Sequence, residues 1–152
     1  MHSSFHHPQL GQFDWDPSVN SWEARVELLS GCTISFSIVA EGIWEGVDPE
    51  RICETAMNFL AKAREHEPHC RQRVADDLLD IYNTSWADDD PEEGMPPHSR
   101  TEFLAAISPS AISLYHDLSS SWSYECGDLF AGHDVWFMLD EKVRFMGKAS
   151  LG

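Results

Sequence analysis

The residues best suited to do chemistry lie in the segment 127–134, Gly-Asp-Leu-Phe-Ala-Gly-His-Asp, directly before the most apolar run of the chain. Histidine titrates near neutral pH, so His133 is a candidate general base, with Asp128 or Asp134 to orient it. That set would serve a small hydrolase or a metal-dependent enzyme. No serine nucleophile motif precedes His133 and no second histidine follows at ligand spacing. The sequence therefore favours the competing interpretation, a structural histidine at a turn.

A second group of candidate ligands is the segment His66-Glu-Pro-His69-Cys70. Imidazole and thiolate groups are the ligands that zinc prefers. The second histidine arrives one residue too early for a metalloprotease motif, and Pro68 is expected to break the helical register that would align the pair. A solvated bend with one packed cysteine is therefore favoured over a metal site. No motif for an organic cofactor is present, and none is expected.

Acidic residues dominate the charge of the chain, with 26 Asp and Glu against 10 Lys and Arg, a net charge of −16. Such a field repels nucleic-acid phosphates and anionic membranes, so the sequence predicts neither kind of partner. It attracts basic proteins, and the candidate partner-binding residues are Asp76, Asp77, Asp80, Asp88, Asp89, Asp90, Glu92 and Glu93. The cluster at 88–93 lacks the ligand spacing of a calcium loop. The alternative is that the acidity only maintains solubility.

The spacing of the cysteines and the hydropathy of the chain indicate the cellular compartment in which the protein is expected. Four cysteines are dispersed, without a Cys-x-x-Cys pair, which is typical of reduced thiols in an intracellular protein. No apolar run reaches the length of a membrane-spanning helix, and the first residues do not resemble a secretion signal. We expect a cytoplasmic protein.

The elements that must position these residues begin with a β-hairpin. Apolar and polar residues alternate over 22–28 and again over 33–38, on either side of Ser30-Gly31. This pattern predicts two antiparallel strands with one face in the core and one in solvent. Residues 13–15 are expected to add a short strand, and residues 1–12 to be loosely held.

A helical hairpin is expected next. Residues 48–50, Asp-Pro-Glu, are a helix start, and apolar residues follow at helical spacing. Pro68 is expected to end this helix and to be followed by a second, which ends near Trp86. The segment 88–97 has the composition of a loop.

The last third is expected to return to strands. A short helix should begin at the capping box Ser99-Arg-Thr-Glu102, and strands are predicted over 111–116, 121–126, 135–139 and 143–146. Residues 135–139, Val-Trp-Phe-Met-Leu, do not alternate, which indicates a strand covered on both faces or central in the sheet.

Several short motifs together resemble a known family. They are Gly11-x-Phe13-x-Trp15, Tyr82-Asn83-x-x-Trp86, Thr101-Glu-Phe-Leu104 and Leu129-Phe130-x-Gly132-His133. In this order they resemble an uncharacterised bacterial domain-of-unknown-function family that closes with a Leu-Phe-x-Gly-His strand hairpin. The resemblance covers nearly the whole chain and implies an α+β fold, but no activity, ligand or catalytic residue.

The sequence thus predicts one α+β domain over residues 1–152, an antiparallel, twisted sheet of about six strands with a helical hairpin packed on one face. The leading functional hypothesis is a non-enzymatic module that binds a basic protein through its acidic surface, as an immunity protein binds its toxin. The alternative is the hydrolase or metal-dependent enzyme built on His133.

Overall fold

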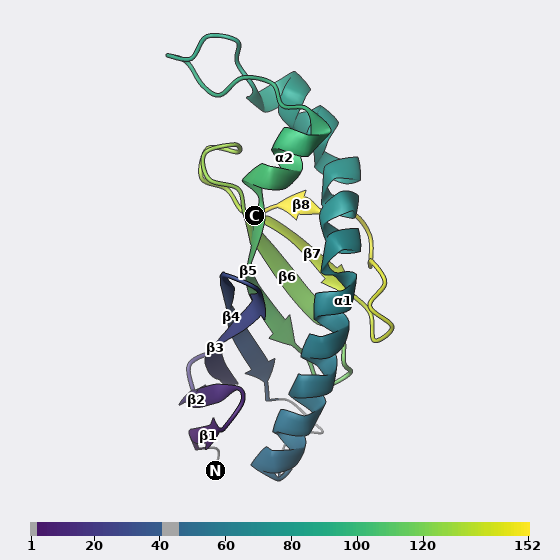
Figure 1. The fold of residues 1–152 in the computed structure, drawn as a ribbon. Helices are drawn as coiled ribbons and strands as arrows, with labels where there is room; N and C mark the ends of the chain where they lie inside the picture. The colour runs from purple at the N-terminus through teal and green to yellow at the C-terminus, as the bar shows by residue number, and fades with distance from the viewer. Residues whose placement is uncertain (1–2, 41–45) are drawn as a thin grey trace.

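The computed structural model describes residues 3–40 and 46–152. These residues form an eight-stranded sheet and two α-helices (Figure 1). The strands are β1 Phe5–His7, β2 Gly11–Asp16, β3 Ser21–Leu29, β4 Cys32–Val39, β5 Ser108–Leu114, β6 Ser120–Glu125, β7 Val135–Leu139 and β8 Ser150–Leu151. The α+β class is as predicted, and the sheet is larger than the expected six strands.

The strands lie in the sheet in the order in which they occur along the chain. Neighbours are antiparallel except β4 and β5, which run parallel, with Ser35 opposite Ala111 and Ile38 opposite Leu114. Parallel neighbours require a long crossover connection, and here the helices supply it. The prediction of a purely antiparallel sheet was wrong at this one junction, because the crossover returns the chain to the end of the sheet where β4 began.

The helical region consists of α1 Pro49–Ile81, the π-helix η2 Tyr82–Trp86 and α2 Arg100–Ala106. The predicted N-terminus of α1 is confirmed, since the Asp48 side chain accepts a hydrogen bond from the Glu50 amide. The predicted capping box of α2 is confirmed as well. The described helices include none with both the length and the apolar composition needed to span a bilayer.

The predicted break at Pro68 does not occur, so there is no helical hairpin. α1 continues through Pro68 for a total of 33 residues. Proline removes one backbone donor, but Pro68 lies on the exposed side of the helix. Residues on both sides of it, such as Ala63 and Val74, are fully buried. Burial of one continuous helix face against the sheet outweighs the missing hydrogen bond.

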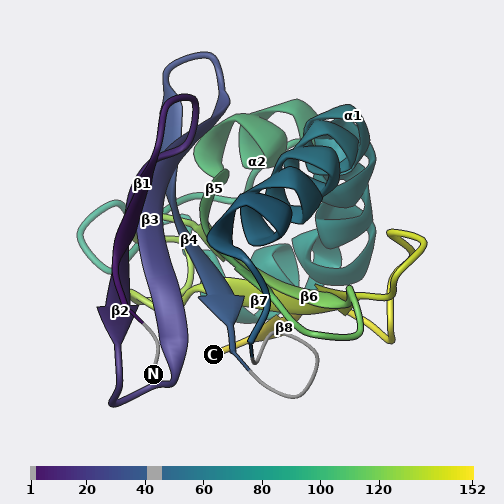
Figure 2. The same ribbon diagram turned by 90° about the horizontal axis from the view of Figure 1, so that it is seen from below.

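The core lies between α1 and one face of the sheet. Trp22, Ala24, Val26 and Leu28 of β3 all point into it, as their alternation predicts. The two halves of the sheet stand at an angle to each other, and both α-helices lie inside that angle (Figure 2). Apolar side chains from both halves therefore surround the helix, which gives a single core cluster among the described residues.

The other face of the sheet carries short hydroxyl side chains in its centre. Ser37 of β4 lies opposite Ser113 of β5, which in turn lies opposite Ser121 of β6, and Ser35 lies on the same face two residues before Ser37. β7 continues this face with Trp136, which is 43% exposed. The prediction that residues 135–139 are covered on both faces was therefore wrong. The strand is also next to the end of the sheet rather than central in it.

The predicted last strand over 143–146 is also wrong. Val143 has a positive φ of 60° and sits in a tight turn after β7. Phe145 makes one isolated bridge to Leu139, and the last strand is β8. The apolar residues in this segment pack against the core from a turn, which a period-two pattern cannot distinguish from a strand over so short a length.

Candidate functional site

The segment between β6 and β7 forms a compact turn at one end of the core. Gly127 and Gly132 have φ values of 54° and 85°, which glycine adopts without strain. Leu129 and Phe130 are buried, so they close this end of the core as their apolar character predicts. The turn thereby presents His133 at the surface.

His133 is exposed, and its Nδ1 lies 3.1 Å from the main-chain oxygen of Gly152. Its ring stands edge-on to Trp86, with centroids 6.1 Å apart. Asp128 and Asp134 are also exposed, and no hydrogen bond within residues 3–40 and 46–152 joins either carboxylate to the His133 ring. The geometry places His133 beside the Trp86 ring and a main-chain oxygen, and neither predicted carboxylate is joined to it.

The π-helix η2 determines where Trp86 lies. Widening the helix from Tyr82 to Trp86 turns Trp86 onto Phe130, with ring centroids 5.6 Å apart, while Tyr82 stays fully buried. π-helical turns are rare and recur at functional positions. Trp86 remains 36% exposed, so one side of its ring packs on the core and the other faces solvent.

The acidic loop that follows η2 is held at its base. The Asp88 amide donates to the Met95 carbonyl at 2.7 Å, which closes the loop. The Tyr82 hydroxyl donates to the Pro96 carbonyl at 2.8 Å, and Asn83 exchanges two hydrogen bonds with the main chain of His98. The loop extends beyond the end of α1 (Figure 1). Its position relative to Trp86 is therefore fixed by η2.

Two of the eight acidic residues that were predicted to bind a partner form ion pairs within the protein. Asp76 forms an ion pair with Arg100 at 2.7 Å. Asp77 pairs with Arg73 and accepts a hydrogen bond from the Ala149 amide at 3.0 Å, so its role is structural. The other six are exposed, and no ion pair within the described residues involves them: Asp80, Asp88, Asp89, Asp90, Glu92 and Glu93.

Exposed apolar side chains accompany these six acids. Ile81 is 45% exposed, Trp86 36% and Met95 38%. We call these three residues, the six free acids and His133 the acidic end. The acids and His133 are separate predictions from the sequence, whereas the exposure of Ile81 and Met95 was not predicted: helical spacing places Ile81 on the apolar face of its helix. The signal for Trp86 was present in the motif Tyr82-Asn83-x-x-Trp86, but its exposure depends on the π-helix, which the sequence did not reveal.

The candidate metal ligands His66, His69 and Cys70 follow one another in the middle of α1. Cys70 is buried, and burial raises the pKa of its thiol to about 12 from the ordinary value of 9.0. The described residues contain no group of three or more side chains arranged to hold a metal ion.

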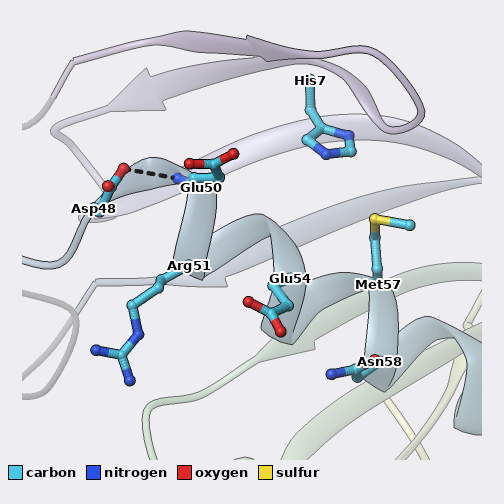
Figure 3. A pocket seen from close by; sticks show the side chains of 7 residues that line it. All are labelled: His7, Asp48, Glu50, Arg51, Glu54, Met57 and Asn58. Atoms are coloured by element: carbon cyan, nitrogen blue, oxygen red, sulfur yellow. Dashed lines mark hydrogen bonds between the residues drawn. The ribbon is translucent and has the colours of Figure 1, made fainter.

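A pocket of about 410 Å³ lies between β1 and the first turns of α1 (Figure 3). It is lined mainly by polar side chains, including His7, Glu50 and Glu54. His7 Nδ1 accepts hydrogen bonds from the Gln9 and Leu10 amides, at 3.1 and 3.2 Å, so it is used in holding the β1–β2 turn. The pocket contains no cysteine or serine nucleophile among its lining residues.

Comparison with known proteins identifies the family of the chain and does not point to a particular site. No curated protein and no solved structure matches it significantly. A family model described as an uncharacterized protein conserved in bacteria (DUF2262) matches residues 7–148. The match includes all strands from β2 to β7 and both α-helices. The chain therefore belongs to the bacterial family DUF2262.

Proposed function

We propose that this protein is a non-enzymatic interaction module that binds a basic segment of another protein at the acidic end. The observation that carries the proposal is the exposed Trp86, which directly precedes a loop of exposed carboxylates without ion-pair partners in the described part of the chain. Tryptophan is one of the three residue types enriched among binding hot spots. An immunity protein that neutralises a basic toxin would use a surface of this kind.

The electrostatics of α1 support the proposal. The last turn of α1 contains no basic residue, although the negative end of the helix dipole lies there. Asp80 and the loop acids add further negative charge at the same end. This distribution is unfavourable in the isolated protein, and a cationic partner would relieve it.

The apolar groups suit the same partner. The face of a tryptophan ring attracts arginine and lysine side chains, an interaction of about 0.5–2 kcal/mol. Ile81 and Met95 provide exposed apolar surface for the aliphatic parts of those side chains. Because the loop is held at its base by Tyr82 and Asn83, little ordering of the main chain is required on binding.

The experiment measures binding to an array of arginine- and lysine-containing peptides, followed by calorimetry of the best binder at low and high salt. Trp86→Ala should weaken binding by roughly 30-fold or more, as for a hot-spot residue. The triple variant D88N/D89N/D90N should weaken it by about tenfold, and the loss should shrink as salt screens the charges.

The matched control is the triple variant D14N/E27Q/E125Q, which changes the net charge equally at exposed positions elsewhere. It should alter binding by less than about twofold, since long-range attraction is screened. Equal losses for both triples would show that only the net charge matters. That result, or the absence of any binding peptide, would contradict the proposal.

A further inference from the structure

A second cavity, of about 210 Å³, lies between α1 and two turns of the sheet. Its lining includes Asn58, Phe59 and Lys62 from α1. Leu118 comes from the β5–β6 turn, and Glu141 and Val143 come from the turn after β7. Three separate elements thus enclose a space with an apolar floor and a polar rim. None of these residues belongs to the acidic end.

The two turns have the same construction. In the first, the Leu118 amide donates to the Tyr115 carbonyl and the Tyr115 amide to the Ser119 carbonyl, both at 3.0 Å. In the second, the Val143 amide donates to the Asp140 carbonyl at 2.9 Å, and the Asp140 amide donates to the Arg144 carbonyl at 2.8 Å. Each is a tight turn followed by one left-handed residue, a position that glycine normally occupies.

Leu118 and Val143 occupy these left-handed positions, with φ values of 66° and 60°. The conformation is unfavourable for leucine and a clear outlier for a β-branched residue. Val143 is 8% exposed, so burial of its side chain offsets the strain. Leu118 is 40% exposed and gains much less burial. Strained residues of this kind recur where a ligand is held.

The rim of the cavity carries opposite charges. Lys62 and Glu141 both line it, and neither takes part in an ion pair within residues 3–40 and 46–152. Asn58, one turn before Lys62 in α1, also lines the cavity. A molecule that carries both an ammonium and a carboxylate group would match the two charges at once.

We propose that this cavity binds a free amino acid with an apolar side chain. Lys62 binds the ligand carboxylate, Glu141 binds its ammonium group, and Phe59 and Leu118 contact its side chain. The cavity is smaller than the roughly 300 Å³ at which sites for drug-sized molecules begin, which restricts the ligand to a small molecule. This site is independent of the proposed function, because it shares no residue with the acidic end.

The test is a titration of the ¹⁵N-labelled protein with L-leucine, followed by NMR. We expect shifts of the Lys62, Leu118 and Val143 amide signals that saturate. Glycine lacks the apolar group, 4-methylpentanoic acid lacks the ammonium group, and leucinamide lacks the carboxylate. Each of these three should bind at least about tenfold more weakly, the value of one charged hydrogen bond or a buried side chain.

Variants locate the binding groups. Lys62→Met and Glu141→Gln should each weaken leucine binding by about tenfold, whereas the controls Lys148→Met and Glu65→Gln should not change it. Leu118→Asn should weaken binding while raising the midpoint of thermal unfolding, because asparagine tolerates the left-handed conformation.

Three results would overturn the proposal. One is the absence of saturable shifts with leucine. Another is equal affinity for glycine and leucine, which would show that the apolar residues of the cavity do not contribute to binding. The third is a Leu118→Asn variant that loses stability and keeps full leucine affinity, because Leu118 would then serve only to pack against α1.

Discussion

At the scale of single residues, Glu67 carries a carboxylate from the middle of α1 into the core. It is 3% exposed, and its Oε1 accepts hydrogen bonds from the Tyr124 hydroxyl at 3.0 Å and from Arg71 Nε at 2.9 Å. Arg71 in turn donates to the Leu104 and Ile107 carbonyls at the end of α2. This network joins α1, β6 and α2, so the buried charge fixes how the helices lie on the sheet.

Removal of the Glu67 carboxylate should be strongly destabilising. Glu67→Ala leaves the Arg71 charge and the Tyr124 hydroxyl without their partner, and we expect a loss of about 3–5 kcal/mol in the free energy of unfolding. Tyr124→Phe removes one hydrogen bond and should cost about 1–2 kcal/mol. Urea unfolding followed by tryptophan fluorescence measures both. Glu65→Ala, at an exposed position of the same helix, is the control, and a Glu67→Ala loss no larger than the control loss would exclude this role.

The buried thiols make stability sensitive to alkaline pH. Burial raises the pKa of Cys70 to about 12 and that of Cys126 to about 11, from the ordinary value of 9.0. Above pH 9.0 the unfolded chain releases these protons while the folded protein retains them, so the unfolded state is favoured. The contribution of these two protonated thiols to stability is therefore fully present below pH 9.0 and is lost as the pH rises toward about 12.

The measurement is the urea midpoint at about pH 8 and at about pH 10.5. The midpoint should fall for the natural chain, and it should fall less for Cys70→Ala, which lacks one of the titrating groups. Cys32→Ala is the comparison: burial raises the pKa of that thiol as well, but the side chain is partly exposed, so its removal should reduce the fall less than Cys70→Ala does. Parallel declines for all three proteins would show that other groups cause the alkaline loss.

At the scale of elements, α1 is notable for continuing through Pro68. The proline ring removes a backbone donor and crowds the preceding turn, a cost of about 3 kcal/mol in an unconstrained helix. Yet Glu67 and Cys70, on either side of it, are buried in the core. The position of the proline between these two residues indicates that packing on the sheet maintains the helix.

Pro68→Ala should therefore stabilise the protein. Alanine restores the hydrogen bond to the Arg64 carbonyl and has the best helix propensity, so we expect a gain of about 1–3 kcal/mol in the free energy of unfolding. Urea titration followed by circular dichroism at a helix wavelength measures the change. Ala61→Gly at an exposed position of α1 is the opposing control and should cost about 1 kcal/mol. A loss of stability in Pro68→Ala would mean that the proline directs Glu67 toward Tyr124.

Patterns of neighbouring residues predict the elements that are determined by interactions between residues close in the sequence. The hairpin of β3 and β4 follows from strict alternation, and the starts of α1 and α2 follow from their caps. The continuity of α1 and the parallel pairing of β4 with β5 depend on contacts between distant segments, so no local pattern contains them. The same holds for the site. Composition predicts the acids of the loop at 88–93, but it cannot predict that Trp86 stands exposed beside them.

At the scale of the whole molecule, the charge of −16 is distributed over a structure with few ion pairs. Four join side chains in the described part of the chain, and three of these lie within α1 or a single turn. Most carboxylates therefore contribute repulsion to the folded state.

Salt should stabilise the protein as a result. Raising the ionic strength from about 20 mM to about 300 mM reduces the screening length from roughly 20 Å to below 10 Å. We expect the midpoint of thermal unfolding to rise by about 2–4 °C, which corresponds to about 1 kcal/mol. Sodium chloride and potassium chloride should act alike, because screening depends on ionic strength. A midpoint that falls with salt would show that the ion pairs outweigh the repulsion.

The lengths of the outermost strands have a consequence for self-association. β1 has three residues and β8 has two, whereas β3 and β4 inside the sheet have nine and eight. A long unpaired edge is a template on which another chain can add a strand and begin an aggregate. Here each outer strand has too few free amide and carbonyl groups to hold an incoming chain in register. The short outer strands at both edges of the sheet therefore disfavour edge-to-edge pairing with other chains.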